Sequence, residues 1–399
     1  MEKILLLFVA MFAYAATATR IRYTFPNYNR TALGDSVDVA SMKLLKEIYE
    51  QSADKNVVSS PLGVLTLLSL YASGSEGKTR AEIMALLGSK DYEQLSGSYS
   101  QLSERFASMD PKYLILANKV LVSDKYTLDD GFFKTAKDYK SEVDNIDFKD
   151  RKMAANAIND WSSSKTRGLI DHPVSESDID PDAVIALLNV IFFQGHWHVP
   201  FNASNTKEQE FNVDRSTIVK KPMMQLRRSL HYHEDNDMGV RMIELPYQES
   251  KFRMIVVLPN EVDGLPDVLE KVAKKGLLEN IFRMRPSRAA VNLNMPKFET
   301  RLKINLNDVL SKVGVSGIFE NASSGIVKER GVKVSKALQE AFVKVDEEGA
   351  TAGAFTGVVT MALSSWSRPP PPIPFKVDRP FLYAILNDDI VLFAGTYSH

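Results

Sequence analysis

The first half of the chain carries apolar residues at the spacing of amphipathic helices. Apolar positions three and four residues apart predict helices over residues 40–49, 60–71, 79–87, 92–106, 129–139 and 151–165. Two segments differ: residues 113–117 predict the start of a strand, and residues 183–193 are almost entirely apolar. A continuous apolar run of this length is typical of a strand that is covered on both faces.

The second half of the chain is richer in strands. Alternating or clustered β-branched and aromatic residues predict strands over residues 240–245, 252–258, 289–298, 382–386 and 390–394, with one helix over residues 265–282. Short polar turns separate the first two strands and the last two, so each pair predicts a hairpin. Helices early in the chain and strands later indicate an α+β fold.

One stretch near the C-terminus follows neither pattern. Residues 332–345 predict a long strand, and an acidic turn from Asp346 to Gly349 ends it. A run of small residues follows, then an apolar segment and a proline-rich run that ends at Pro374. Small residues neither anchor a core nor clash inside a sheet. This composition therefore suits a loop that inserts into a sheet.

This stretch, VKVSKALQEAFVKVDEEG over residues 332–349, resembles the strand and proximal hinge of the serpin family. Six further segments are similar to serpin motifs and occur in the family's order: residues 56–61 (NVVSSP), 189–197 (NVIFFQGHW), 242–247 (MIELPY), 256–259 (VVLP), 295–298 (MPKF) and 378–381 (DRPF). The resemblance implies an α+β serpin fold with three β-sheets, about nine helices and an exposed reactive-centre loop at about residues 348–374. It also implies a single domain over residues 19–399.

The N-terminus has the three parts of a secretory signal peptide. Lys3 is the basic residue, residues 4–16 are apolar but too few to span a bilayer, and Ala16 to Ala18 provide small residues before a cleavage site. We therefore expect residues 1–18 to be removed and the protein to be secreted, with a buried N-terminal helix as the alternative. Candidate N-glycosylation sites for an extracellular protein are Asn29, Asn202 and Asn321.

Composition and motifs argue against several other classes of protein. The net charge of -1 gives no reason to expect a nucleic-acid partner, and the absence of cysteine excludes disulfides within the chain. No Gly-x-Ser-x-Gly segment is present, as many serine hydrolases would require. The pairs His196/His198 and His231/His233 lack a third ligand at metal-binding spacing. We expect a protein that is not an enzyme and has no metal or cofactor.

A serpin inhibits its target as a suicide substrate, and the resemblance implies the same reaction here. The protease cleaves the reactive-centre loop and forms an acyl-enzyme, and the loop then inserts into a sheet and distorts the protease. The family's commonest spacing from Glu347 places the reactive bond at Leu363–Ser364. Leucine suits chymotrypsin-like or elastase-like serine proteases. Met361 is a weaker candidate for the reactive bond because its spacing from Glu347 fits less well. Arg368 is also weaker, because Pro369 opposes cleavage after it.

Three groups of residues are expected to control insertion, all by resemblance. The hinge comprises Glu347, Glu348, Gly349, Ala350, Thr351, Ala352, Gly353, Ala354 and Phe355. The breach at the top of the sheet comprises Trp197, Lys297 and Glu347, and the shutter comprises Ser60, Gly63, Asn189 and Gln339. Gly63 replaces a serine of the family and Gln339 replaces a histidine. A glutamine amide can donate and accept hydrogen bonds, so it can fill part of the histidine's role.

Alternation along an inserted strand divides the hinge into two faces. Ala350, Ala352, Ala354 and Thr356 would share one face, and Thr351, Gly353 and Phe355 the other. The first face is small and uncharged, which favours insertion. Phe355 would slow insertion if it had to pass under a covering helix, and would matter little on an open face.

Partners follow from these expectations. The main one is a serine protease held in a covalent complex by a monomeric inhibitor, and no membrane contact is expected. A heparin site is not expected either, because residues 92–109 carry acidic side chains instead of a basic stripe. Two alternatives remain at this point: inhibition of a papain-like cysteine protease, and a non-inhibitory serpin that binds or carries a ligand.

Overall fold

The computed structural model describes residues 28–171, 174–249, 251–320, 325–329, 331–349 and 370–399. The described residues form nine α-helices, in agreement with the expected number: α2 (Ala32–Gln51), α3 (Pro61–Ser73), α4 (Gly77–Leu86), α5 (Tyr92–Ala107), α6 (Asp130–Asp138), α7 (Arg151–Thr166), α8 (Leu265–Lys275), α9 (Leu278–Arg283) and α10 (Asn307–Lys312). Single 3-10 turns are η1 (Glu176–Asp178), η2 (Ala203–Asn205) and η3 (Gly317–Phe319). Within these ranges, every helix is too short or too polar to cross a lipid bilayer.

Helix α10 was not predicted from the sequence, and two of the helices that were predicted differ for local reasons. Helix α2 begins eight residues earlier than predicted, because the Thr31 side chain caps its first turn by accepting a hydrogen bond from the backbone N–H of Gly34. The predicted helix over residues 265–282 is two helices. Gly276 separates them with a φ of 74°, and the Asp38 carboxylate then accepts hydrogen bonds from the N–H groups of Leu277 and Leu278 at the start of α9.

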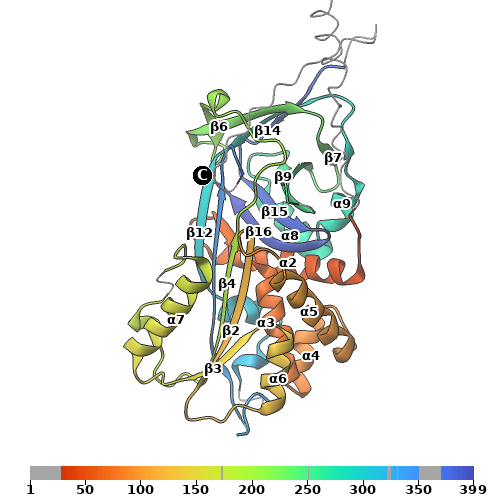
Figure 1. Cartoon of the computed structure of the whole chain (residues 1–399). Coiled ribbons are helices and arrows are strands. Elements are labelled where there is room, and N and C mark those ends of the chain that lie inside the picture. The colour runs from red at the N-terminus through yellow and green to blue at the C-terminus, as the bar shows by residue number, and fades with distance from the viewer. Residues whose placement is uncertain (1–27, 172–173, 250, 321–324, 330, 350–369) are drawn as a thin grey trace, which may run out of the picture.

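The strands of the described residues form three sheets (Figure 1). A seven-stranded sheet has the order β1 (Val57–Ser59), β16 (Ile390–Tyr397), β15 (Phe381–Asn387), β9 (Phe252–Pro259), β8 (Val240–Pro246), β7 (His231–Asp235) and β10 (Arg285–Pro286). A four-stranded sheet has the order β14 (Ile373–Lys376), β11 (Val291–Pro296), β6 (Ile218–Arg228) and β5 (Lys207–Asn212). A five-stranded sheet has the order β12 (Phe298–Asn305), β13 (Val334–Val345), β4 (Ile185–Phe193), β2 (Leu114–Ser123) and β3 (Glu142–Ile146).

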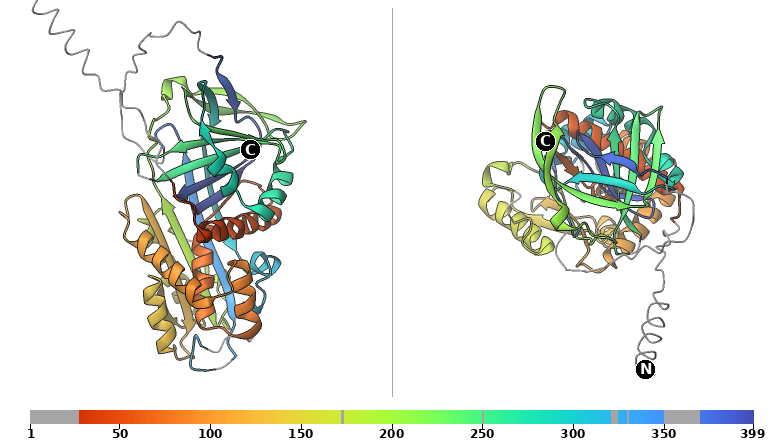
Figure 2. Two further views of the ribbon diagram at one scale, coloured as in Figure 1. Left: turned by 90° about the vertical axis from the view of Figure 1, so that its right-hand side faces the viewer. Right: turned by 90° about the horizontal axis from the view of Figure 1, so that it is seen from above.

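The fold segregates the two halves of the chain. Figure 2 shows most helices of the first half at one end of the molecule and most strands of the second half at the other. The predicted hairpins β8–β9 and β15–β16 are neighbours in the seven-stranded sheet, and nearly all of their residues are buried. The α+β fold with three sheets is therefore confirmed.

Strand β4 joins two hydrophobic cores, and all nine of its residues are buried. Its residues Leu188 and Val190 pack against Ile158 and Trp161 of α7, whereas its alternate residues belong to the main core. This two-sided burial explains the continuous apolar run that the sequence shows. It also places α7 over one face of the five-stranded sheet.

Candidate functional site

The site lies where β4 and β13 meet in the middle of the five-stranded sheet. These strands are parallel and directly paired, with Ala337 opposite Leu187 and Gln339 opposite Asn189. Their outer neighbours, β2 and β12, are both antiparallel to them. A strand that ran antiparallel to both β4 and β13 could therefore be accommodated between them, with regular hydrogen bonding on each side.

The upper end of this β4–β13 junction already holds one further residue. After β13 the chain turns at Glu347 and Glu348, and Gly349 pairs antiparallel with Asp346 on one side and with His196 on the other. Gly349 has a φ of 114°, and a Cβ atom there would lie 2.3 Å from the carbonyl oxygen of Gly195. Only glycine fits this backbone position, because both the conformation and the space exclude a side chain.

The three predicted breach residues come together around this turn. The Lys297 ammonium lies 2.7 Å from the Glu347 carboxylate, which also accepts a hydrogen bond of 2.7 Å from the hydroxyl of Thr206. The Trp197 indole N–H donates to the carbonyl of Asp346 at 2.8 Å, and the Trp197 ring stacks on Tyr247. Sequence reasoning missed Thr206, which no motif singled out.

The ionisation of Glu347 follows from these contacts. Its partial burial favours the neutral carboxyl, but the hydrogen bonds from Lys297 and Thr206 outweigh this effect and lower the pKa of Glu347. The turn is therefore held at neutral pH by a charged pair as well as by the backbone. The backbone N–H groups of Trp197 and Phe201 add hydrogen bonds to the carbonyls of Glu348 and Glu347.

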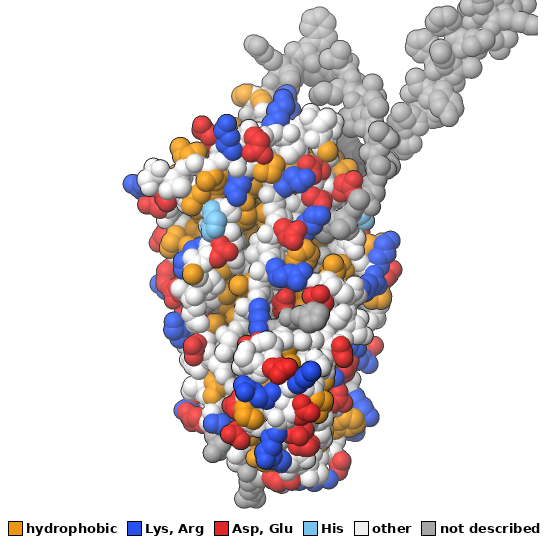
Figure 3. All heavy atoms as spheres, turned by 90° about the vertical axis from the view of Figure 1, so that its left-hand side faces the viewer, with side chains coloured by type: hydrophobic (Ala, Val, Ile, Leu, Met, Phe, Trp, Pro, Cys, Tyr) orange, Lys and Arg blue, Asp and Glu red, His pale blue; other side chains and the backbone are white. Residues whose placement is uncertain are grey.

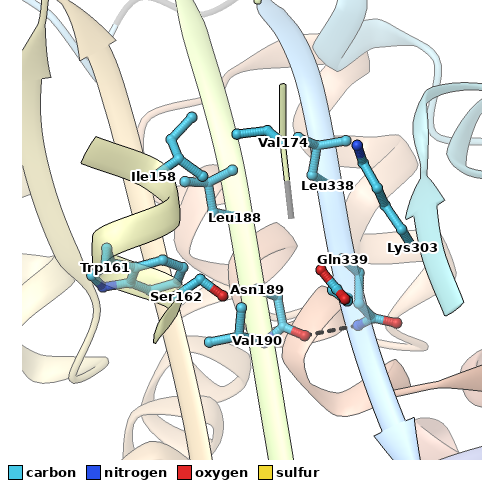
Figure 4. A pocket seen from close by; sticks show the side chains of 11 residues that line it. Ile158, Trp161, Ser162, Val174, Leu188, Asn189, Val190, Lys303, Leu338 and Gln339 are labelled. Atoms are coloured by element: carbon cyan, nitrogen blue, oxygen red, sulfur yellow. Dashed lines mark hydrogen bonds between the residues drawn. The ribbon is translucent and has the colours of Figure 1, made fainter. Parts of the chain in front are cut away.

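The predicted shutter residue Gln339 lies below the turn, and both the oxygen and the nitrogen of its side-chain amide form hydrogen bonds. Its oxygen accepts hydrogen bonds from the Ser59 hydroxyl at 2.7 Å and from the Ser60 N–H at 2.9 Å. Its nitrogen donates to the Ser60 carbonyl at 2.7 Å and to the Asn189 side-chain oxygen at 2.8 Å (Figure 4). The glutamine thus ties β13 to the start of α3 and to β4.

Ser60 and Gly63, two other predicted shutter residues, contribute without a side-chain hydrogen bond. Ser60 contributes its backbone, while its hydroxyl is buried without a hydrogen-bond partner; the hydroxyl bound to Gln339 belongs to Ser59. Gly63 leaves the space that the Asn189 amide occupies, since a Cβ atom at Gly63 would lie 2.1 Å from the Asn189 nitrogen. Asn189 in turn donates to the side chain of Asn118 at 2.8 Å, a partner that sequence reasoning missed.

The remaining predicted residues lie outside this site or outside the residues that the structure describes. The reactive bond Leu363–Ser364, the hinge residues 350–355 and the sequon at Asn321 fall outside the described residues. Asn29 and Asn202 are exposed. Within the described ranges, no three His, Asp or Glu side chains are grouped so that they could hold a metal ion.

Comparison with known proteins identifies the family. The family profile described as "Serpin (serine protease inhibitor)" matches residues 36–399. The chain is 32% identical over 400 residues to Antitrypsin of Bombyx mori, with 100% of both chains covered, and 31% identical over 363 residues to Antichymotrypsin-2 of Bombyx mori, with 90% of this chain and 96% of the relative covered. The crystal structure of Serpin48 from Tenebrio molitor superposes with a TM-score of 0.82 at 27% identity and covers 94% of this chain and 100% of that chain. The chain therefore belongs to the serpin family and is a serine protease inhibitor, not an enzyme.

Proposed function

We propose that this serpin is secreted and traps serine proteases of chymotrypsin-like or elastase-like specificity as a suicide substrate. The protease cleaves the Leu363–Ser364 bond and remains bound to Leu363 as an acyl-enzyme. The loop from Ala350 onward then inserts between β4 and β13. The observation that carries this proposal is the position of Gly349, which already pairs with both Asp346 and His196 at the top of the junction.

The register of the inserted strand follows from these two pairs. Moving down an antiparallel pair, each step forward on one strand is a step back on the other. Seven steps from Gly349 lead to Thr356, and the same seven steps lead from Asp346 to Gln339 and from His196 to Asn189. Gln339 and Asn189 are opposite each other in the closed sheet, so the two extrapolations agree.

This register gives each hinge side chain a face. Thr356 would lie between Gln339 and Asn189, and its hydroxyl can replace their direct hydrogen bond because it both donates and accepts. Ala350, Ala352 and Ala354 would share this face, which points into the main core. Phe355 would lie opposite Glu340 and Val190, on the face that α7 covers. In this register the small side chains would lie on the face of the sheet that contributes to the main core.

The specificity rests on Leu363, whose side chain suits an apolar pocket. The names of the two relatives, one an antitrypsin and the other an antichymotrypsin, differ, so they do not select a protease class. Secretion rests on the signal-peptide pattern of residues 1–18, and the exposed Asn29 and Asn202 are compatible with N-glycosylation. We also propose that residues 19–399 form one domain and act as a monomer.

Incubation of residues 19–399 with chymotrypsin tests the function. We expect a complex that survives denaturing electrophoresis, and a released C-terminal peptide that begins at Ser364. Complete cleavage without a complex would contradict trapping of this protease class. If the protein formed such a complex only with a papain-like protease, its targets would be cysteine proteases of that class.

A matched pair of variants tests the register. Thr356→Arg would place a charge between Gln339 and Asn189, so we expect cleavage without a complex. Thr351→Arg carries the same change on the opposite face, between Lys344 and Gln194, which are only partly buried. We expect this variant to retain complex formation. Equal behaviour of the two variants would contradict the register.

A further inference from the structure

The linker between α7 and β4, which the structure describes over residues 167–171 and 174–184, is fastened to α7. The Asn159 amide of α7 donates to the Val174 carbonyl at 2.9 Å and accepts from the Val174 N–H at 3.0 Å. Arg151 at the start of α7 donates to the carbonyl of Ile179 at 3.0 Å. The linker therefore moves with α7, and its end continues directly into β4.

The same linker reaches strands on the other side of the β4–β13 junction. The Asp178 carboxylate accepts a hydrogen bond of 2.8 Å from Lys303 of β12. Lys336 of β13 donates to the backbone carbonyl of Asp178 at 2.6 Å, and its ammonium lies 3.9 Å from the carboxylate. Arg301 of β12 donates to the carbonyl of Leu169 at 2.6 Å. These contacts span the line along which the sheet must part.

Asp178 is oriented for this role by its own turn. Its carboxylate accepts hydrogen bonds of 2.9 Å from the backbone N–H and from the hydroxyl of Ser175, the residue that precedes η1. The hydrogen bond from Lys303, followed by that from the Ser175 N–H, holds the pKa of Asp178 well below its ordinary value. The carboxylate is therefore ionised at every pH at which the protein would act.

Space beneath the linker is incompletely filled. A cavity of about 20 Å³ is lined by Val174 of the linker, Leu188 of β4 and Leu338 of β13 (Figure 4). A larger cleft of about 230 Å³ lies beside it and includes Asp178 and Lys336 in its lining. The linker residues Val174 and Ile179 are nevertheless buried in the core beneath α7, so apolar packing and the polar contacts of Asp178 together hold the linker over the junction.

We propose that Asp178, bound by Lys303 and Lys336, is a latch that holds the α7 linker across the β4–β13 junction and limits the rate at which the cleaved loop inserts. This inference rests on the proposed function. Insertion widens the junction by one strand spacing, about 4.8 Å. A hydrogen bond of 2.8 Å cannot span that distance, so the latch must open before the new strand passes. Asp178 is a positioning residue, because it acts by holding the linker in place.

The latch is electrostatic and partly exposed, and salt should therefore weaken it. The Asp178, Lys303 and Lys336 side chains are 31%, 41% and 26% exposed. Figure 3 shows basic and acidic side chains intermixed over the face of the molecule that includes α7 and β12. Exposed ion pairs are screened by salt. Faster insertion at higher ionic strength is a signature that loss of packing alone would not produce.

The test compares two lysine-to-methionine variants that differ in where their ion pairs lie. Lys303→Met removes the shorter of the two lysine contacts to the Asp178 carboxylate and leaves Lys336 bound to Asp178. Lys165→Met removes an ion pair of 2.5 Å between α7 and Glu142 of β3, which lies wholly on the β4 side of the junction. The two lysine side chains are similarly exposed, at 41% and 39%. Both variants lose one charge and one salt bridge. A difference between their insertion rates therefore depends on whether the lost salt bridge crosses the β4–β13 junction.

The readout is the rate of insertion after the loop of the full chain is cleaved, followed by intrinsic tryptophan fluorescence; of the three tryptophans, Trp161 lines the cavity under α7. We expect Lys303→Met to speed insertion about three- to tenfold, as loss of one charge-assisted hydrogen bond allows, and to reduce the salt dependence, with Lys336 still bound to Asp178. Lys165→Met should stay within about twofold of the unmodified protein. An unchanged rate in Lys303→Met, or equal acceleration in both variants, would overturn the latch.

Failure of the proposed function would look different. If the unmodified protein gained no thermal stability after cleavage, the loop would not insert at all and both proposals would be wrong. If it gained stability and trapped its protease while Lys303→Met changed neither rate nor salt dependence, only the latch would be wrong.

Discussion

The upper and middle parts of the β4–β13 junction are built in opposite ways. At the top the strands have already parted around Gly349, and a backbone turn held by Lys297 and Glu347 fills the gap. In the middle, the side chains of Gln339 and Asn189 are hydrogen-bonded to each other, and the parallel strands pair continuously from Lys336 to Ala341. The entrance for a new strand is therefore preformed, while its path is closed.

This difference indicates where the barrier to insertion lies. Under the proposed function, a loop that has been cleaved would extend a pairing that Gly349 has already begun. It must then break the bond between Gln339 and Asn189 and displace the α7 linker. We infer that contacts in the middle of the sheet form the main barrier to insertion, and that the preformed entrance at the top speeds the first pairing.

The largest effect is expected from Gln339→Leu, which would remove the hydrogen bonds that join β13 to β4 and to the start of α3 in the middle of the junction. The Ser60 N–H and the Asn189 amide oxygen would lose a partner inside the protein, and each such group costs about 1–3 kcal/mol. We expect a loss of about 3 kcal/mol in the free energy of unfolding, measured by denaturant titration. Gln339→His should lose less, because imidazole still offers a donor and an acceptor. Equal stability of Gln339→Leu and the unmodified protein would show that the Gln339 hydrogen bonds do not hold the middle of the junction closed.

A smaller effect is expected from Gly349→Ala, which would disturb the preformed entrance. The new Cβ would lie 2.3 Å from the Gly195 carbonyl oxygen and 2.7 Å from the Trp197 nitrogen, so the turn must leave its place. We expect a loss of about 2 kcal/mol and slower complex formation, because the turn can undock without unfolding the sheet.

The control for this prediction is Gly239→Ala. Gly239 also has a positive φ, of 71°, but a Cβ there would meet no atom within 4 Å. Its substitution should lose only about 1 kcal/mol from backbone strain and leave complex formation unchanged. Equal rates of complex formation in the two variants would show that the preformed entrance has no kinetic role.

The smallest effect is expected from Glu347→Gln, which keeps the turn but removes its charge. Loss of the ion pair with Lys297 should lower stability by about 0.5–1 kcal/mol at pH 7. Because the pKa of Glu347 is lowered in the folded protein, its contribution is present above the ordinary carboxyl pKa of about 4.3 and is lost as the pH falls through the folded value. The difference between the two proteins should therefore shrink as the pH falls below about 4.

A double-mutant cycle checks this assignment. Lys297→Met should lose a similar amount, and the double variant should lose little more than either single variant. Additive losses would mean that Glu347 and Lys297 stabilise the turn independently, through contacts other than their ion pair.

Much of the fold could be predicted from the sequence, because hydrophobic periodicity reflects local geometry. The two-sided strand over residues 183–193, the closing hairpin and most helices were recognised in this way. Boundaries that depend on side chains elsewhere were missed. The start of α2 depends on Thr31, which also bonds to Asp389, and the separation of α8 from α9 depends on Asp38.

The site could be predicted only where a motif marked it. Glu347, Lys297 and Gln339 were found because each lies in a segment that resembles the family. Asn118, Thr206 and Asp178 lie in segments without such a motif, and their roles arise from contacts with residues far along the chain. The sequence also suggested that Gly63 was a lost hydroxyl, whereas the structure shows that it leaves room for Asn189.

The sequence by itself determined the family, the α+β fold and the small, uncharged hinge, because these properties reside in residue order and composition. Only the tertiary structure decided that Gly349 is already paired at the entrance, that Ser59 and not Ser60 supplies the hydroxyl to Gln339, and that Asp178 reaches across the junction. These contacts join segments more than a hundred residues apart. Their geometry depends on how the sheets and helices pack together, which local patterns in the chain do not encode.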